Sequence, residues 1–267
     1  MSCRQDSTAT VAPSVAMWRS PFLGSRNDRK DGCSMFVPTL YRQPDTSWMV
    51  DLVRRNPLAL LVTGGTASTG PNATHLPAIP DPAMTGEWPE NLVGATLLGH
   101  LNRANPHWGT LRTGAVALLT FTGPHAYVSP TVYQTAPAAP TWNFTAVHVR
   151  GVLELLPAGE ETLQVVQATV RAFEAQFGAE WDMTDSLGYF RKILPAVGAF
   201  RLTITGADGM FKLSQEQEPE IRERVRRSFS ERDCGRHRAT AELMGRLPVN
   251  GRTASSQHTG NRTGGAP

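Results

Sequence analysis

The feature that most limits the fold of this chain is a two-residue alternation between residues 143 and 156, NFTAVHVRGVLELL. Successive side chains of a β-strand point to opposite faces, so this period predicts a strand with one face in the core. The buried face would carry Thr145, Val147, Val149, Leu153 and Leu155, and the other face Phe144, His148, Arg150 and Glu154. Such a strand needs partner strands on both edges.

Five further apolar runs, each bounded by glycine or proline, supply those partners. They span residues 57–64, 73–79, 92–100, 115–123 and 198–213. The helices are inserted between strands rather than alternating with them, which favours an antiparallel barrel over a doubly wound sheet. The sequence therefore predicts a mainly β fold with α-helices (α+β), a six-stranded antiparallel barrel with peripheral helices.

One long amphipathic helix is predicted over residues 160–178. Its apolar positions recur every three or four residues, and Gly178 follows as an end signal. The expected buried stripe is Leu163, Val166, Val170, Phe173 and Phe177.

The folded part is predicted to be one domain spanning residues 35–229, followed by a helical segment over 230–249. Residues 1–34 mix polar residues without periodicity, and residues 250–267 are polar and of low complexity. Both ends are therefore expected to be disordered.

The net charge of +3 is unevenly distributed. Residues 1–34 carry +2, residues 35–220 carry −5, and residues 221–267 carry +6. The acidic central part argues against a fold that binds nucleic acid through its phosphates. The basic run over 222–238 could touch an acidic partner, but a solvated helix face is favoured.

Several other classes of protein are disfavoured. No apolar run approaches the length of a membrane span, and the N-terminus lacks the apolar core of a signal peptide, so a cytoplasmic protein is expected. The three cysteines, Cys3, Cys33 and Cys234, lack metal-ligand spacing. Sequence patterns for phosphate loops, dinucleotide folds, serine hydrolases and zinc proteases are absent.

The segment GHLNRANPHW, residues 99–108, is unusually rich in ring-bearing and polar residues. Asn105 followed by Pro106 predicts the start of a short helix over 105–112, with His107 exposed. His100 closes a strand, where a histidine is either a hydrogen-bonded structural residue or a ligand. Spacing alone leaves both readings of His100 open.

Residues 122–144 form the most irregular stretch inside the domain, with four prolines and several aromatic residues. A loop of this length in a compact domain is usually functional. The side chains that could line a flat aromatic ligand, or pack on a second subunit, are Tyr127, Ser129, Tyr133, Trp142 and Asn143.

Lys212 stands at the end of the last strand and could bind an anion, although an exposed lysine is the more frequent outcome. Ser214 is a candidate N-cap for the following helix. Gln217 stands three residues further on, which is the spacing of a capping box.

The chain resembles PaiB-type proteins, split-barrel proteins described as FMN-binding negative transcriptional regulators. The resemblance spans residues 35–229 and rests on the ordered motifs MFVP, NPLALLVT, THLP, GHLNRANPHW, GPHAYVSPTVY, PTWNF, AVHVRG and FKLSQ. It implies a six-stranded antiparallel split barrel of the FMN-binding type, a homodimer, and a cofactor pocket at the dimer interface.

Within that family the chain is most similar to piperazate synthases of natural-product pathways. The similarity rests on TAPAAPTWNFT in place of a basic loop, on KLSQEQ, and on WDMTDSLGYFRKILPAVGAF. It implies haem b in place of FMN, with His100 as the axial iron ligand. It also implies a dehydrating cyclisation of side-chain N-hydroxylated L-ornithine to L-piperazic acid, with formation of an N–N bond.

This resemblance assigns roles to the remaining residues. Tyr127 is the expected proton donor or positioning residue, and Lys212 or Arg103 would bind a haem propionate or the substrate carboxylate. The full expected cofactor-binding set is His100, Arg103, Asn105, Ser129, Tyr133, Trp142 and Asn143, with Tyr127 and Lys212 as the expected catalytic residues. The rival expectations are an FMN-binding flavoprotein with a reductase or regulatory role, and a non-enzymatic DNA-binding repressor.

Overall fold

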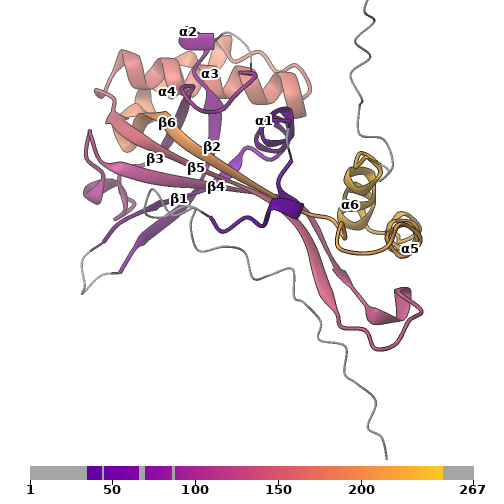
Figure 1. Ribbon diagram of the computed structural model, residues 1–267. Helices are drawn as coiled ribbons and strands as arrows, with labels where there is room; N and C mark the ends of the chain where they lie inside the picture. The colour runs from indigo at the N-terminus through magenta and orange to yellow at the C-terminus, as the bar shows by residue number, and fades with distance from the viewer. Residues whose placement is uncertain (1–34, 44, 66–69, 86–87, 249–267) are drawn as a thin grey trace, which may run out of the picture. The chain divides into compact units, whose positions relative to one another are not determined.

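The computed structural model describes residues 35–43, 45–65, 70–85 and 88–248 (Figure 1). The disorder predicted for residues 1–34 and 250–267, together with Cys3 and Cys33, lies outside this part of the chain.

Six antiparallel strands close into a barrel in the order β1-β2-β3-β6-β5-β4, as the alternation predicted (Figure 1). The strands are β1 (Leu58–Thr63), β2 (Asn72–Pro80), β3 (Thr96–Asn102), β4 (Val116–Val128), β5 (Thr141–Leu155) and β6 (Val197–Lys212). The predicted α+β barrel is confirmed. One strand begins later than expected, because residues 92–95 form a turn in which Ala95 N–H bonds to the Leu92 carbonyl and Gly94 has a φ of 89°.

The segment expected to be irregular, residues 122–144, is strand at both ends, because β4 continues to Val128 and β5 begins at Thr141, whereas residues 129–140 between them are turns and irregular structure. β4 and β5 continue beyond the barrel as a two-stranded arm, defined here as residues 123–144 (Figure 1). The register shifts between Thr122 and His125, where the arm leaves the barrel. The prolines that suggested a loop are concentrated at the tip.

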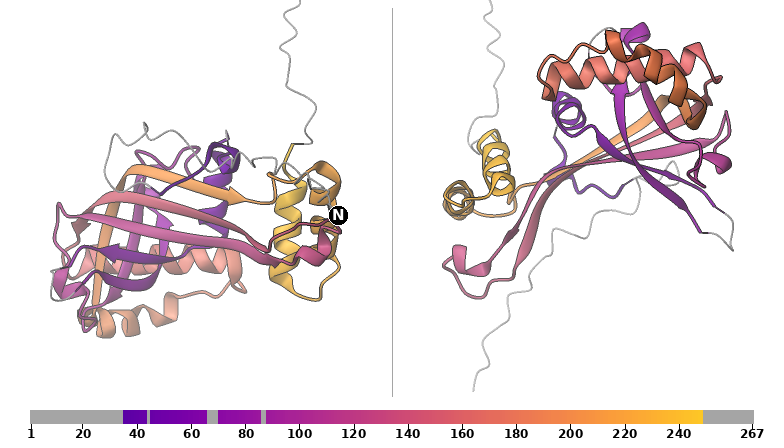
Figure 2. Two further views of the ribbon diagram at one scale, coloured as in Figure 1. Left: turned by 60° about the horizontal axis from the view of Figure 1, so that its bottom comes forward. Right: turned by 180° about the vertical axis from the view of Figure 1, so that it is seen from behind.

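Helices lie at two places around the barrel. The helices are α1 (Ser47–Arg55), α2 (Pro82–Thr85), α3 (Glu160–Phe177), α4 (Leu187–Ile193), α5 (Pro219–Ser230) and α6 (Gly235–Gly245), with 3-10 turns at η1 (Thr39–Tyr41), η2 (Trp108–Thr110), η3 (Pro130–Val132), η4 (Thr184–Ser186) and η5 (Leu194–Ala196). Figure 2 shows α3 and α4 beside the barrel, and α5 and α6 beside the arm.

The predicted helix over 160–178 is confirmed, and its expected stripe is buried in part. Its buried residues are Thr162, Leu163, Val165 and Thr169, whereas Phe177 is 58% exposed. Ala168, Ala172 and Phe173 pack on the barrel beside Val165. Of the expected stripe, Leu163 is buried and Phe173 packs inward as predicted, Val166 and Val170 are only partly buried, and Phe177 at the end of the helix is exposed.

Gly99 of β3 is required by the packing of the core. It pairs with Phe200 of β6, whose side chain is fully buried. A Cβ atom at Gly99 would lie 2.5 Å from the Phe200 Cζ atom, closer than any real contact. The phenylalanine ring therefore fills the space beside the β3 backbone directly before His100.

The turn that follows β3 is held by a buried histidine. His107, expected to be exposed, is only 3% exposed. Its Nε2 lies 2.9 Å from the Thr63 Oγ1, and its Nδ1 lies 2.9 Å from the Thr74 Oγ1. The predicted helix over 105–112 is reduced to η2, because Asn105 Oδ1 accepts the His107 N–H and closes a tight turn over β1 and β2.

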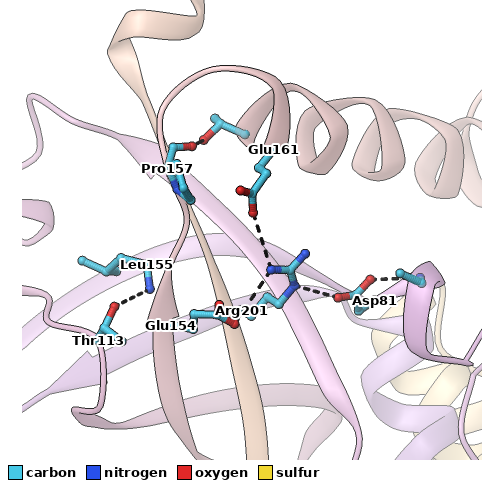
Figure 3. A network of polar contacts seen from close by, with 9 residues as sticks. Asp81, Thr113, Glu154, Leu155, Pro157, Glu161 and Arg201 are labelled. Atoms are coloured by element: carbon cyan, nitrogen blue, oxygen red, sulfur yellow. Dashed lines mark hydrogen bonds and ion pairs between the residues drawn. The ribbon is translucent and has the colours of Figure 1, made fainter.

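An ion-pair network joins α3 to the barrel (Figure 3). The Arg201 Nε of β6 lies 3.0 Å from the Asp81 Oδ2, and the Asp81 side chain is only 4% exposed. The same guanidinium lies 3.8 Å from a Glu154 oxygen and 3.9 Å from a Glu161 oxygen. One arginine thus connects the end of β2, β5 and the first turn of α3.

Replacing Arg201 by methionine should lower the free energy of unfolding by about 3 kcal/mol, because it takes the guanidinium away from a buried carboxylate. Urea denaturation measures the change. Glu154→Gln is the matched control: its side chain is 59% exposed, so its loss should be small. Equal destabilisation by both variants would contradict this account.

Acid should destabilise the fold through His107. Burial lowers the pKa of His107 from its ordinary value of 6.5. As the pH falls below 6.5, the unfolded chain takes up a proton before the folded chain does, so stability present above pH 6.5 is progressively lost. The His107→Gln variant should lose less stability than the wild type between pH 7.5 and 5.5.

Urea melts at the two pH values measure this difference. His75→Gln, at an exposed position of β2, is the control and should retain the wild-type pH dependence. If His107→Gln also retained it, the buried imidazole would not be a source of the acid sensitivity.

Candidate cofactor site

The end of β3 presents His100 on the outer face of the barrel. Leu97 and Leu101 point into the main core, whereas Leu98 packs in the cluster that includes Val165 of α3. Alternation along the strand puts His100 on the same side as Leu98.

His100 is half-buried, and its Nδ1 atom is covered without a hydrogen-bond partner in the described part of the chain. Burial lowers the pKa of His100, so the ring is neutral at neutral pH. A neutral imidazole is the form that binds iron and other metals. The reading of His100 as a satisfied structural histidine finds no hydrogen bond at Nδ1 to support it.

Arg103 and Asn105 follow His100 but differ in what they offer. Arg103 is exposed, its guanidinium lies 5.4 Å from the centre of the Trp108 ring, and it has no ion-pair partner in the described ranges. The Asn105 Nδ2 donates to the Thr74 Oγ1 at 3.1 Å. Arg103 is therefore free to bind an anion, whereas the Asn105 amide helps to hold the turn.

Aromatic side chains form an exposed surface on one face of the arm. Tyr127 is 45% exposed and Trp142 is 48% exposed, and their ring centres lie 5.9 Å apart across the two strands. The Trp142 Nε1 donates to the His125 Nδ1 at 3.1 Å. The Ser129 side chain accepts a hydrogen bond from the Thr131 N–H at the start of η3.

The opposite face of the arm is buried. Asn143 is fully buried, and its Nδ2 donates to the Ser214 Oγ at 2.9 Å. Tyr133 is 3% exposed, and its hydroxyl is covered without a hydrogen-bond partner in the described residues. Burial raises the pKa of Tyr133, so the phenol stays protonated.

Lys212 lies at the base of the arm. Its Nζ donates to the Thr141 Oγ1, and it lies 5.9 Å from the centre of the Tyr41 ring. Burial, with the Glu216 carboxylate as a second cause, raises the pKa of Tyr41 well above its ordinary range. Lys212 is half-buried, and its ammonium is hydrogen-bonded to Thr141 rather than exposed at the end of the strand.

The prediction that Ser214 caps the next helix is wrong. It adopts a φ of 65° in the turn after β6, and α5 begins five residues later at Pro219 without a side-chain cap. The Gln217 N–H bonds to the Ser214 carbonyl instead. The spacing of a capping box was misleading because the serine hydroxyl is used by Asn143.

The predicted site residues fall into two groups within the chain. The first group is His100, Arg103 and Asn105 at the end of β3, and the second is Tyr127, Ser129, Tyr133, Trp142, Asn143 and Lys212 on and below the arm. No hydrogen bond, ion pair or ring contact joins the two groups among the described residues. In Figure 1 the arm extends away from the barrel, whereas β3 lies in its wall.

Residues 35–248, outside the gaps, contain neither a clustered metal site nor a membrane-spanning helix. No cluster of three or more histidine, cysteine or acidic side chains there could hold a metal ion. No helix in these ranges is long and apolar enough to cross a membrane.

Comparison with known proteins identifies relatives over most of the barrel. Residues 35–206 match the family described as "Putative FMN-binding domain". Protease synthase and sporulation protein PAI 2 of Bacillus subtilis is 26% identical over 185 residues, which cover 68% of this chain and 83% of that protein. An uncharacterized protein of Emericella nidulans is 26% identical over 215 residues, covering 68% of this chain and 85% of that protein.

Solved structures with a similar fold are more distant. The FAD and haem binding protein from Mycobacterium smegmatis is 17% identical, with a TM-score of 0.46, over 68% of this chain and 78% of that chain. The haem storage protein of Vibrio cholerae is 12% identical, with a TM-score of 0.38, over 64% of this chain and 96% of that chain.

The family that the motifs predicted is therefore confirmed at the level of the barrel. Because its model matches well over half of the sequence, this chain belongs to the FMN-binding domain family, whose split barrel is the six-stranded ring seen here.

Proposed function

We propose that the protein is a haem-dependent piperazate synthase, which converts side-chain N-hydroxylated L-ornithine to L-piperazic acid with loss of water. The observation that carries this proposal is the neutral, half-buried imidazole of His100, whose covered Nδ1 has no hydrogen-bond partner in the described residues. The motif resemblance to piperazate synthases supports the choice of haem over FMN. No external reductant is needed, because the N–O bond that breaks and the N–N bond that forms balance with the release of water.

The residues at the end of β3 fit the proposed cofactor. Since Nδ1 of His100 is covered, Nε2 is the nitrogen left for the iron. Arg103, exposed and without an ion-pair partner in the described ranges, suits a haem propionate. When bound, haem iron would supply a Lewis acid that weakens the N–O bond of the hydroxylamine.

Side chains of the arm would position the substrate and deliver a proton during the cyclisation. The two nitrogens must be held in contact, and exposed Tyr127 and Trp142 can enclose the substrate and exclude water. Hydroxide is a poor leaving group, so the Tyr127 hydroxyl would deliver a proton to the departing oxygen. The Lys212 ammonium would hold the substrate carboxylate.

We further propose that the site is completed by a second copy of the chain. Within one subunit the arm group and the end of β3 make no direct contact among the described residues. A homodimer in which each arm covers the partner's β3 would unite them, and a closed two-fold pair is the commonest way for a protein to self-associate.

An FMN-binding flavoprotein is the second candidate function, favoured by membership of the FMN-binding domain family. In that case Arg103 would face the FMN phosphate, and the neutral His100 would lie against the flavin rather than a metal.

Absorption spectroscopy of the purified full-length protein offered hemin separates the two candidates. Haem bound through His100 should give a Soret band. The His100→Ala variant lacks the axial ligand, so its Soret band should be absent or much weaker, and its turnover should fall at least about a hundredfold. His75→Ala, at an exposed position, should keep both. A protein that instead retains yellow flavin, or a His100→Ala variant with full Soret absorbance and turnover, would refute the proposal.

Mixing variants tests whether the site is shared between subunits. His100→Ala and the double variant Tyr127→Phe/Trp142→Ala should each be nearly inactive as homodimers. After unfolding and refolding together in equal amounts, half of the dimers carry one intact site of two, so about a quarter of the wild-type activity should return. Activity that stays at the level of the separate variants would place both groups in one subunit's site.

A further inference from the structure

A cavity of about 480 Å³ lies between α1, α6 and the start of the arm. This volume falls in the range of small-molecule sites. Its apolar wall includes Trp48 and Leu52 of α1, Phe211 of β6 and Leu243 of α6. None of the residues assigned to the cofactor site lines it, and α6 lies beyond the residues matched by the family.

Most of the polar side chains that line the cavity already have partners. The Arg246 guanidinium lies 4.4 Å from the centre of the Trp48 ring and 3.3 Å from an Asp51 oxygen. The Asn56 Nδ2 donates to the Leu52 carbonyl. These groups therefore stabilise the wall of the cavity and are not available to a ligand.

Arg55 and Glu242 are the exceptions. Each is an exposed residue on the lining of the cavity, and neither has an ion-pair partner in the described part of the chain. They do not pair with each other either, so their charged atoms are separated by more than ion-pair distance. The cavity thus combines one unpaired positive group, one unpaired negative group and an apolar wall.

We propose that this cavity binds a free α-amino acid with an apolar side chain. Its carboxylate would bind the Arg55 guanidinium, which suits a planar anion, and its ammonium would bind the Glu242 carboxylate. Its side chain would contact the apolar wall. A simple acid or a simple amine would leave one of the two protein charges unmatched, so the zwitterion is the ligand that this pair of charges selects.

Isothermal titration calorimetry of the full chain with phenylalanine tests the proposal. Phenylalanine should bind saturably, whereas 3-phenylpropanoate and 2-phenylethylamine, which each lack one charge, should bind at least about tenfold more weakly. Arg55→Met and Glu242→Gln should each weaken phenylalanine binding by a similar factor, with unfolding midpoints close to that of the wild type.

Arg54→Met is the matched control, because this substitution removes the same charge at a neighbouring position that does not line the cavity, and Asp51, the partner of Arg54, keeps its ion pair with Arg246. It should retain wild-type affinity for phenylalanine. The proposal fails if neither phenylalanine nor leucine binds saturably, if 3-phenylpropanoate binds as tightly as phenylalanine, or if Arg55→Met behaves like Arg54→Met.

Discussion

The pairing of β3 with β6 is the contact on which the rest of the structure depends. It closes the ring between the β1–β2 hairpin and the long β5–β6 pair, and it brings Gly99 opposite Phe200. Because a one-residue slip would exchange the two faces of β3, burial of Leu97 and Leu101 fixes the direction of His100 as well. The side chain at the centre of the proposed chemistry is thus oriented by the packing of its neighbours in the core.

Patterns that repeat within one strand predicted the barrel well, since alternation reports directly which face is buried. The errors occurred where a distant contact decides the outcome. His107 is buried because Thr63 and Thr74 supply oxygens for both of its ring nitrogens, and nothing within residues 99–108 reveals those partners. The periodicity of α3 predicted the inward packing of Leu163 and Phe173 but not the exposure of Phe177, because a repeat in the sequence does not report how far along the helix its neighbours cover it.

The candidate site could be predicted only in part from the sequence, because distant contacts also decide the environments of its residues. The motif resemblance named the candidate residues, and the structure gives those residues different environments. Trp142 and Asn143 are adjacent in the chain, yet one is half-exposed and the other is fully buried. A loop would leave both free to face a ligand, whereas the observed strand sends them to opposite faces of the arm. The prolines of this segment favoured a loop in the sequence analysis, so the alternation of Trp142 and Asn143 was not predicted.

The C-terminal helices cover one face of the arm and leave its other face exposed. A two-stranded ribbon on its own is marginally stable in water. Here Ala126 and Asn143 are buried on the side of α5 and α6, and the Arg224 Nη2 donates to the Tyr133 carbonyl at 2.6 Å. The C-terminal helices therefore hold the arm extended, and exposed Tyr127 and Trp142 on its other face remain without cover. Apolar surface held in this way is the kind that a second subunit or a flat cofactor buries, and the proposed site would use both.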